Sequence, residues 1–319
     1  MKSRPILILL LIAAVVVSIS AQQRGGDDRR PRRQRGFDSG SGSYSNEVSL
    51  RISGNYRYVS ANGIPVHATG QFPNRNNPNT IRPQHHSYRL PMSPTTNRVA
   101  TVFNLMPFGI AINGVPFDPN AAEFWQRDFN SGWQYEPKGG SIDLGLDENN
   151  AHVQPTGAYH YHAMPTGLAR RLFVDGRPVL VGYAADGFPI YARYGYENAA
   201  DPQSELIEMR PSYRIKAGSR PGGPGGTYDG TFVQDYEYVA GLGDLDECNG
   251  RFGITPEYPK GIYHYYITDN WPYLPRKFRG TPDDSFKRHR PPPGGRGGPG
   301  GGRGGPPGFG PPGQRPRGF

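Results

Sequence analysis

The stretch VLVGYAADGFPIYA, residues 179–192, places a run of branched and aromatic residues directly before an Asp-Gly pair. Asp-Gly and Asn-Gly pairs favour the positive φ angles that tight β-hairpins require. Pro189 follows two residues after Gly187, and a proline cannot donate a hydrogen bond to a neighbouring strand. The stretch therefore predicts a hairpin whose second strand lies at a sheet edge or starts at a bulge.

The same turn pattern, Asn or Asp followed by Gly, any residue and Pro, occurs at residues 62–65, 113–116, 175–178 and 186–189. Further strand-like runs are rich in aromatic and branched residues: NYRYVS (55–60), HSYRLP (86–91), FGIAI (108–112), RLFV (171–174), TFVQDYEYV (231–239) and IYHYYIT (262–268). Short strands separated by Gly and Pro turns indicate an all-β fold, either a β-sandwich or a jelly-roll-like single domain.

Helix signals are scarce in this chain. Asp118 can cap a helix that begins at Pro119 and continues through Asn-Ala-Ala-Glu-Phe to Trp125. We expect one short helix of two or three turns here. The strands and this helix together predict a single folded β domain over residues 47–282.

The N-terminal segment, MKSRPILILLLIAAVVVSISAQQ, reads as a targeting signal. A basic start, an apolar run over residues 6–17 and small residues before Gln22 are typical of a secretory signal peptide. We expect the signal to occupy residues 1–21, with cleavage after Ser20 or Ala21. The apolar run is shorter than the ~20 residues that a membrane span needs, so we expect no transmembrane span after cleavage. The predicted location is secreted, in the periplasm or outside the cell.

The formal net charge of +9 lies in the flanks of the β domain, because acidic and basic residues nearly balance within residues 47–282. Residues 22–46, a basic linker, and residues 283–319, a Gly/Pro/Arg-rich tail, cannot build a core, so we expect both to be disordered. The tail resembles Arg-Gly segments that bind RNA inside cells, but behind a signal peptide we expect no specific nucleic-acid partner. Two alternatives remain for the flanks: contact with acidic polymers by counterion release, or a solvated spacer.

Two distant segments repeat one pattern. The sequence Leu-Asp-Glu, a loop and Gly-x-Tyr-His-Tyr occurs in residues 146–161 and again in residues 245–265. The copies differ, because His152 and His162 of the first correspond to Arg251 and Tyr266 of the second. We predict two similar strand-loop units that serve one site.

These residues resemble the YHYH-domain family of secreted, mainly bacterial proteins, whose function is largely unassigned. The matching stretches are ANGIPVHATGQFP (61–73), INGVPF (112–117), LDENNAHVQPTGAYHYH (146–162), GYAADGFPIYARYGY (182–196), LDECNGRFGITPEYPKGIYHYYIT (245–268) and WPYLPRKFRGTP (271–282). Family members often carry Cys-Gly-Gly-His where this chain has residues 149–152, Asn-Asn-Ala-His. The resemblance therefore leaves Cys248, the single cysteine, without the disulfide partner that other members could supply. It supports the domain boundary and secretion, and it implies no established reaction.

The Tyr-His-Tyr-His strand predicts a metal site. Residues i and i+2 of a strand project to one face with Cα atoms about 6.6 Å apart. The imidazoles of His160 and His162 can then reach one metal at Zn–N distances of about 2.0–2.1 Å. His152 can return to them through the turn at residues 153–157, and His264 completes the site if the two Tyr-His-Tyr strands are neighbours. Three or four neutral imidazoles suit zinc, copper or iron.

A second tier of residues accompanies these ligands. His67 follows the first Asn-Gly turn and either approaches the site or is simply hydrogen-bonded. Glu148, with Asp147, has three alternatives: to supply a carboxylate ligand, to hold its turn, or to orient a ligand imidazole from behind, and the last two are favoured. Asp186 is expected to tolerate a positive φ angle at its hairpin turn.

Three hypotheses about function remain open. The first is a secreted module that binds a transition metal through its histidine cluster. The second is a metal-free extracellular binding or surface module, in which His and Tyr alternate along an amphipathic strand. The third is a metal-dependent hydrolase or oxidase, which needs an open position on the metal. The sequence contains no G-x-S-x-G, phosphate-loop or dinucleotide motif, so whether the protein is an enzyme stays open.

Overall fold

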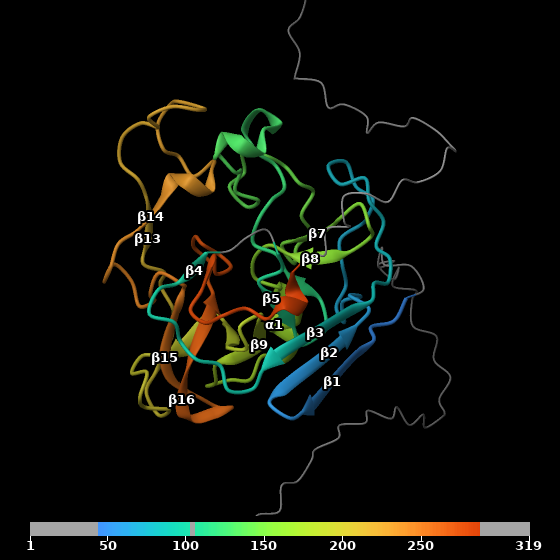
Figure 1. The fold of residues 1–319 in the computed structure, drawn as a ribbon, viewed down its shortest axis with the longest axis vertical. Helices are drawn as coiled ribbons and strands as arrows, with labels where there is room; N and C mark the ends of the chain where they lie inside the picture. The colour runs from blue at the N-terminus through green and yellow to red at the C-terminus, as the bar shows by residue number, and fades with distance from the viewer. Residues whose placement is uncertain (1–43, 103–105, 288–319) are drawn as a thin grey trace, which may run out of the picture. The chain divides into compact units, whose positions relative to one another are not determined.

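The computed structural model describes residues 44–102 and 106–287, which form several β-sheets and one α-helix (Figure 1). This architecture confirms the all-β expectation with one short helix. The expected signal peptide and most of the two expected disordered flanks lie outside the described residues. Within the described ranges, no helix is long and apolar enough to cross a membrane.

The largest sheet has eight strands. In spatial order they are β15 (Gly250–Thr255), β16 (Tyr258–Ile267), β10 (Pro189–Ala192), β9 (Val179–Ala184), β5 (Gly109–Ala111), β6 (Pro116–Phe117), β8 (Tyr159–Tyr161) and β7 (Ala151–Val153). The pairs β10–β16 and β6–β8 are parallel, and the other neighbours are antiparallel.

The opening hairpin forms as β9 and β10, but β10 lies inside the sheet between β9 and β16. Pro189 is its first residue, and the pairing with β9 shifts register between Ile190 and Tyr191. The expectation of an edge strand is therefore wrong for this hairpin, and the bulge is present. A proline at the first position of a strand removes no ladder bond from the strand interior.

The eight-stranded sheet has the same strand order on both sides of its centre. There, Ile110 of β5 lies opposite Tyr183 of β9, between the pairs Gly109–Ala184 and Ala111–Gly182. Each side continues with a strand that begins at a turn proline (β6 or β10), then the parallel Tyr-His-Tyr strand (β8 or β16), then an antiparallel edge strand (β7 or β15). A pseudo-two-fold axis through the Ile110–Tyr183 pair therefore relates the two halves.

Smaller sheets surround this one. They are the antiparallel sheet β1 (Val48–Ser53), β2 (Tyr56–Ala61) and β3 (His86–Pro91), and the two-stranded pairs β11 (Tyr194–Tyr196) with β12 (Leu206–Glu208), β13 (Tyr213–Ile215) with β14 (Tyr236–Tyr238), and β4 (Thr101–Val102) with β17 (Lys277–Phe278). One large hydrophobic cluster joins Val59 and Leu90 of the three-stranded sheet to Tyr161 and Tyr265 of the two halves. Cys248 belongs to this cluster, and its burial raises the pKa of the thiol to about 12.

The helix is not where capping signals placed it. Residues 118–122 form no helix, because the amide of Asp118 donates to Tyr161 O at 2.8 Å and so continues the pairing of β6 with β8. Short 3-10 turns follow as η1 (Trp125–Arg127) and η2 (Phe129–Ser131), and others are η3 (Val233–Asp235) and η4 (Asp284–Phe286). The α-helix is α1 (Thr166–Leu172), which buries Leu168. It occupies part of the run 171–174, so the strand expected there is wrong.

The folded part also extends beyond its expected C-terminal boundary. Phe286 of η4 is buried and stacks on Tyr88 of β3 with ring centroids 4.1 Å apart. Asp283 accepts a hydrogen bond from Arg89 Nε at 2.9 Å. Residues 283–287 therefore belong to the fold rather than to a disordered tail.

Candidate metal centre

Three histidines come together on the hairpin of β7 and β8. The register places His152 of β7 opposite His160 of β8, and His162 follows β8 directly. The ring centroids lie 4.7 Å apart for His152–His160, 4.7 Å for His152–His162 and 4.6 Å for His160–His162. One ligand nitrogen from each ring lies within 4.8 Å of the other two. We call these three residues the histidine triad.

The acidic turn before β7 sets the geometry of this hairpin. The Asp147 carboxylate accepts hydrogen bonds from the backbone amides of Asn149 at 2.8 Å and Ala151 at 3.2 Å, and from the Tyr159 hydroxyl at 2.6 Å. Asn150 adopts a φ of 54°, a left-handed conformation that asparagine tolerates well. Asp147 therefore holds the turn, whereas the Glu148 side chain is exposed and lies outside the triad.

Hydrogen bonding orients the His152 ring, while His162 is left without a partner among the described residues. His152 Nδ1 lies 2.8 Å from Leu144 O, which fixes the proton on Nδ1 and leaves the lone pair on Nε2. His160 Nδ1 lies 3.3 Å from Ala158 O. His162 is only 2 % exposed, and neither of its ring nitrogens has a hydrogen-bond partner within the described part of the chain. A buried polar group without a partner is rare and needs an explanation.

Burial favours the neutral form of His152 and His162. It lowers the pKa of His162 well below its ordinary value, and the neighbouring His160 and His152 imidazoles and the Arg276 guanidinium add to this effect, whereas the nearby Asp118 backbone opposes it without forming a hydrogen bond of normal geometry. Burial also lowers the pKa of His152, although the bond to Leu144 O opposes the shift. Neutral imidazoles with free lone pairs are the form that binds a metal.

The triad lines a cavity of about 290 Å³. Its wall also carries Asn79, Asp118, Asn120 and Gln154. The sequence did not indicate a site role for Asp118 or Gln154. One sequence feature could have indicated Asp118: it directly follows the Asn-Gly-Val-Pro-Phe segment. That segment contains β6, whose pairing with β8 exists only in the folded protein.

The second copy of the pattern forms the same hairpin at the other end of the sheet. Asp246 accepts hydrogen bonds from the amide of Cys248 at 2.8 Å and from the Tyr263 hydroxyl at 2.9 Å, and Asn249 has a φ of 57°. Arg251 lies opposite His264 just as His152 lies opposite His160. The backbone frame is thus repeated, with other side chains at two of the three triad positions.

Those other side chains satisfy the remaining histidine. His264 Nε2 lies 2.9 Å from the Tyr266 hydroxyl, and its Nδ1 lies 2.9 Å from Ile262 O. The Arg251 guanidinium packs over the Tyr266 ring at 5.7 Å and donates to Tyr196 O. Burial lowers the pKa of His264 to about 4. His264 is therefore a neutral, hydrogen-bonded residue of the core.

The predicted residues do not all converge. Four strands separate β8 from β16, so the two Tyr-His-Tyr strands are not neighbours (Figure 1). The condition on which His264 was to complete the site therefore fails, and the two units do not serve one site. Strand pairing between distant segments decided this point, and it cannot be read from either strand alone.

The second-tier residues have structural contacts. His67 Nε2 lies 2.6 Å from the Tyr161 hydroxyl, on the face of β8 opposite the triad, so His67 is hydrogen-bonded rather than a ligand. Asp186 is buried, and it accepts hydrogen bonds from Tyr265 Oη and from the amide of Gly280. The positive φ of its turn, 92°, belongs to Gly187, so the expectation that Asp186 tolerates this angle is wrong. Burial raises the pKa of Asp186 to about 6.

Asp186 instead matches Asn113 of the other half. Asn113 Nδ2 donates to the Tyr161 hydroxyl at 2.9 Å, as Asp186 bonds the equivalent Tyr265. The turn residue in each half thus anchors the second tyrosine of its Tyr-His-Tyr strand.

Of three comparisons with known proteins, one finds a match. Residues 87–280 match the family described as YHYH protein. No curated protein and no solved structure matches the chain. The matched region includes β5 to β17 and both Tyr-His-Tyr strands. The chain therefore belongs to the YHYH family.

Proposed function

We propose that this protein binds one transition metal ion through the histidine triad of His152, His160 and His162. The observation that carries the proposal is the state of His162, whose two buried ring nitrogens have no hydrogen-bond partner among the described residues. Leaving a buried donor or acceptor unpaired costs about 1–3 kcal/mol. A metal ion would remove the acceptor's share of this cost, because it takes the lone pair of one imidazole nitrogen.

The contrast between the two halves supports this proposal over a purely structural role. Where one of the three positions is histidine, as at His264, its ring is hydrogen-bonded by Tyr266 and Ile262. Where all three are histidines, the third ring lacks partners. In the other half, Asn249 Oδ1 and Arg251 Nε also lack partners within the described ranges, so the contrast concerns the imidazoles: a metal-free module would be expected to satisfy its buried histidines alike in both halves.

The ligand set favours zinc, copper or iron. Three imidazole nitrogens form a borderline-soft donor set, which suits these ions better than magnesium or calcium, which prefer oxygen ligands. No carboxylate belongs to the group of close ligand atoms within the described residues. Three protein ligands also leave one position of a tetrahedral ion open.

The open position makes a metal-dependent hydrolase or oxidase the second candidate. The three histidines line a cavity, so an ion held by them borders space that a ligand can enter. Such an ion would supply a Lewis acid, or an activated water molecule, to a substrate. The side chains of the triad would hold and orient the ion.

We further propose that the protein acts outside the cytoplasm. The support is the N-terminal sequence, with its basic start, apolar run and small residues. Contact of the basic flanks with acidic polymers belongs to the same proposal, because the net charge of +9 lies mainly there. Salt-sensitive binding of a core that lacks both flanks would contradict the second point.

Metal analysis of protein purified without chelator tests the main proposal. We expect close to one zinc, copper or iron ion per chain, and much lower occupancy for His160→Ala and His162→Ala. His264→Ala is the matched control, because it removes a histidine from the equivalent strand of the other half, and its metal content should equal that of the wild type. Metal-free protein with all three variants behaving alike would refute the proposal.

A further inference from the structure

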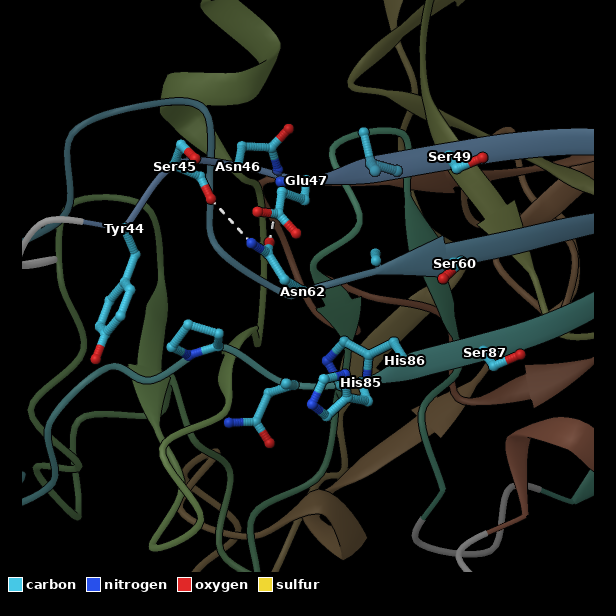
Figure 2. A pocket seen from close by; sticks show the side chains of 14 residues that line it. Tyr44, Ser45, Asn46, Glu47, Ser49, Ser60, Asn62, His85, His86 and Ser87 are labelled. Carbon is cyan, nitrogen blue, oxygen red and sulfur yellow. Dashed lines mark hydrogen bonds between the residues drawn. The ribbon is translucent and has the colours of Figure 1, made fainter.

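The cavity beside the triad is one part of a longer groove. A second cavity of about 280 Å³ shares Asp118, Gln154 and His160 with the first, so the two meet at His160. The second cavity in turn shares Gln84 and His86 with a wider hollow of about 830 Å³. Figure 2 shows this hollow, in which His85 and His86 face the loop that carries Asn62. We call the three connected spaces the groove.

The groove is polar and nearly free of positive charge. Among the described residues that line it there is no arginine, and the single lysine is Lys287 at the second cavity. Asparagine, glutamine, serine and tyrosine side chains supply most of its polar atoms. The carboxylates of Glu47, Asp118 and Glu123 also line it. A polyanion would need several cationic partners and would be repelled by these carboxylates, so this lining fits an uncharged ligand better than an anionic one.

Near the triad, hydrogen bonds orient the side-chain amides of Asn79 and Asn120. Each amide keeps one free end, so both a donor and an acceptor remain for a ligand. Asn79 uses Nδ2 on Val153 O at 2.7 Å, which leaves its Oδ1 to accept. Asn120 uses Oδ1 to accept from Arg276 at 3.0 Å, which leaves its amide hydrogens to donate. Gln154 lies where the two smaller cavities meet, and its side-chain amide makes no hydrogen bond to any described residue. A hydroxyl group both donates and accepts, so it matches this arrangement.

A peptide that adds as a strand to β7 or β3 is a poorer fit, because part of each of these two edges is already capped. The side-chain amides of Asn77 and Asn79 both donate to the backbone carbonyl Val153 O of the edge strand β7. On β3, the backbone amide and carbonyl of Arg89 both bond the Ser285 hydroxyl. Strand addition needs free backbone groups along an edge.

We propose that the groove binds a neutral oligosaccharide chain, with a sugar hydroxyl at the open position of the metal. This inference rests on the proposed metal site for that last contact. Each smaller cavity is near the lower end of the size range of ligand pockets, so each suits one small unit of a chain rather than one large ligand. Because they meet at His160, the chain would have units on both sides of the ion.

Calorimetric titration of the full-length, metal-loaded protein tests the proposal. The probes are cellohexaose, chitohexaose and laminarihexaose, with polygalacturonate and hexaglycine as the charged and peptide alternatives. We expect at least one hexaose to bind and the two alternatives not to. Gln154→Ala should weaken that binding roughly 3- to 10-fold, the effect of one lost neutral hydrogen bond. Gln154→Trp, which fills the junction, should abolish it.

Gln203→Ala, on an exposed turn, is the matched control and should bind like the wild type. The metal content of all three variants should be unchanged, because none alters the triad. Metal-loaded protein that binds none of the hexaoses, or binds one equally well with Gln154→Trp, would overturn the groove proposal and leave the metal site standing. If the protein takes up no metal but its hexaose binding still depends on Gln154, the metal site is refuted and the groove proposal stands without its contact to the ion. Preferred binding of polygalacturonate or hexaglycine would overturn the choice of ligand.

Discussion

Replacing His162 with leucine should change the stability of the protein in opposite directions with and without metal. Without metal, the neutral ring buries one donor and one acceptor that have no partner, each at a cost of about 1–3 kcal/mol. Leucine is of similar size and removes both polar atoms, so the metal-free variant should be about 2 kcal/mol more stable than the metal-free wild type. With metal at 1,000 times its Kd, the wild type gains about 4 kcal/mol. The variant loses most of that gain and should then be about 2 kcal/mol less stable.

Urea denaturation measures both differences, once with a chelator and once with excess zinc, from the midpoint and slope of each transition. His264→Leu is the control from the other half of the sheet. It leaves the Tyr266 hydroxyl and Ile262 O without their partner, so it should destabilise the protein in both conditions. If His162→Leu destabilises the protein in chelator as His264→Leu does, and zinc makes no difference, then His162 is an ordinary core residue and the reasoning fails.

Three further predictions use the second half and the single cysteine. The double variant Arg251→His with Tyr266→His places three histidines on the repeated frame, so elemental analysis should find a second ion per chain; an unchanged content would mean that the frame alone does not suffice. Burial holds the pKa of His264 at about 4 against about 6.5 in the unfolded chain, so the unfolded chain binds the extra proton between these pH values. The contribution of His264 to the free energy of unfolding should therefore fall by about 3 kcal/mol as the pH drops from 6.5 to 4. The urea midpoint of His264→Gln should depend less on pH than that of the wild type. An unchanged pH profile would contradict this assignment. Cys248 is buried with a raised pKa, so it should react with a thiol reagent only after urea is added, and rapid labelling of the native protein would show that the β15 edge opens readily.

The local parts of the fold were predictable, and the parts that depend on distant pairing were not. The strand runs around residues 56–61, 86–91 and 179–184 follow from residue type and turn chemistry. His160 and His162 share a face because alternation along a strand is a local property. The helix at residues 118–125 failed because a tertiary hydrogen bond from Asp118 to Tyr161 outweighed a good capping signal.

The candidate site shows the same division. His152 joined the triad because a short turn returns it to the same hairpin, which the spacing already indicated. His264 was wrongly assigned to the metal site because a sequence repeat indicates that two hairpins have similar structures. It does not indicate that the two hairpins are adjacent in the sheet. Asp118 and Gln154 went unnoticed because they border the triad only once β6, β7 and β8 are assembled.

The pseudo-two-fold axis has a consequence for local opening of the protein. On the proposed function, the β7–β8 edge gains an ion that takes a lone pair of the unpaired His162 ring, whereas the histidine of the β15–β16 edge, His264, is already hydrogen-bonded. Removal of the ion should therefore speed amide hydrogen exchange in β7 and β8 and leave exchange in β15 and β16 unchanged. The metal-depleted chain would keep its eight-stranded sheet and open locally only at β7 and β8. Loss of the metal would therefore inactivate the site without unfolding the protein.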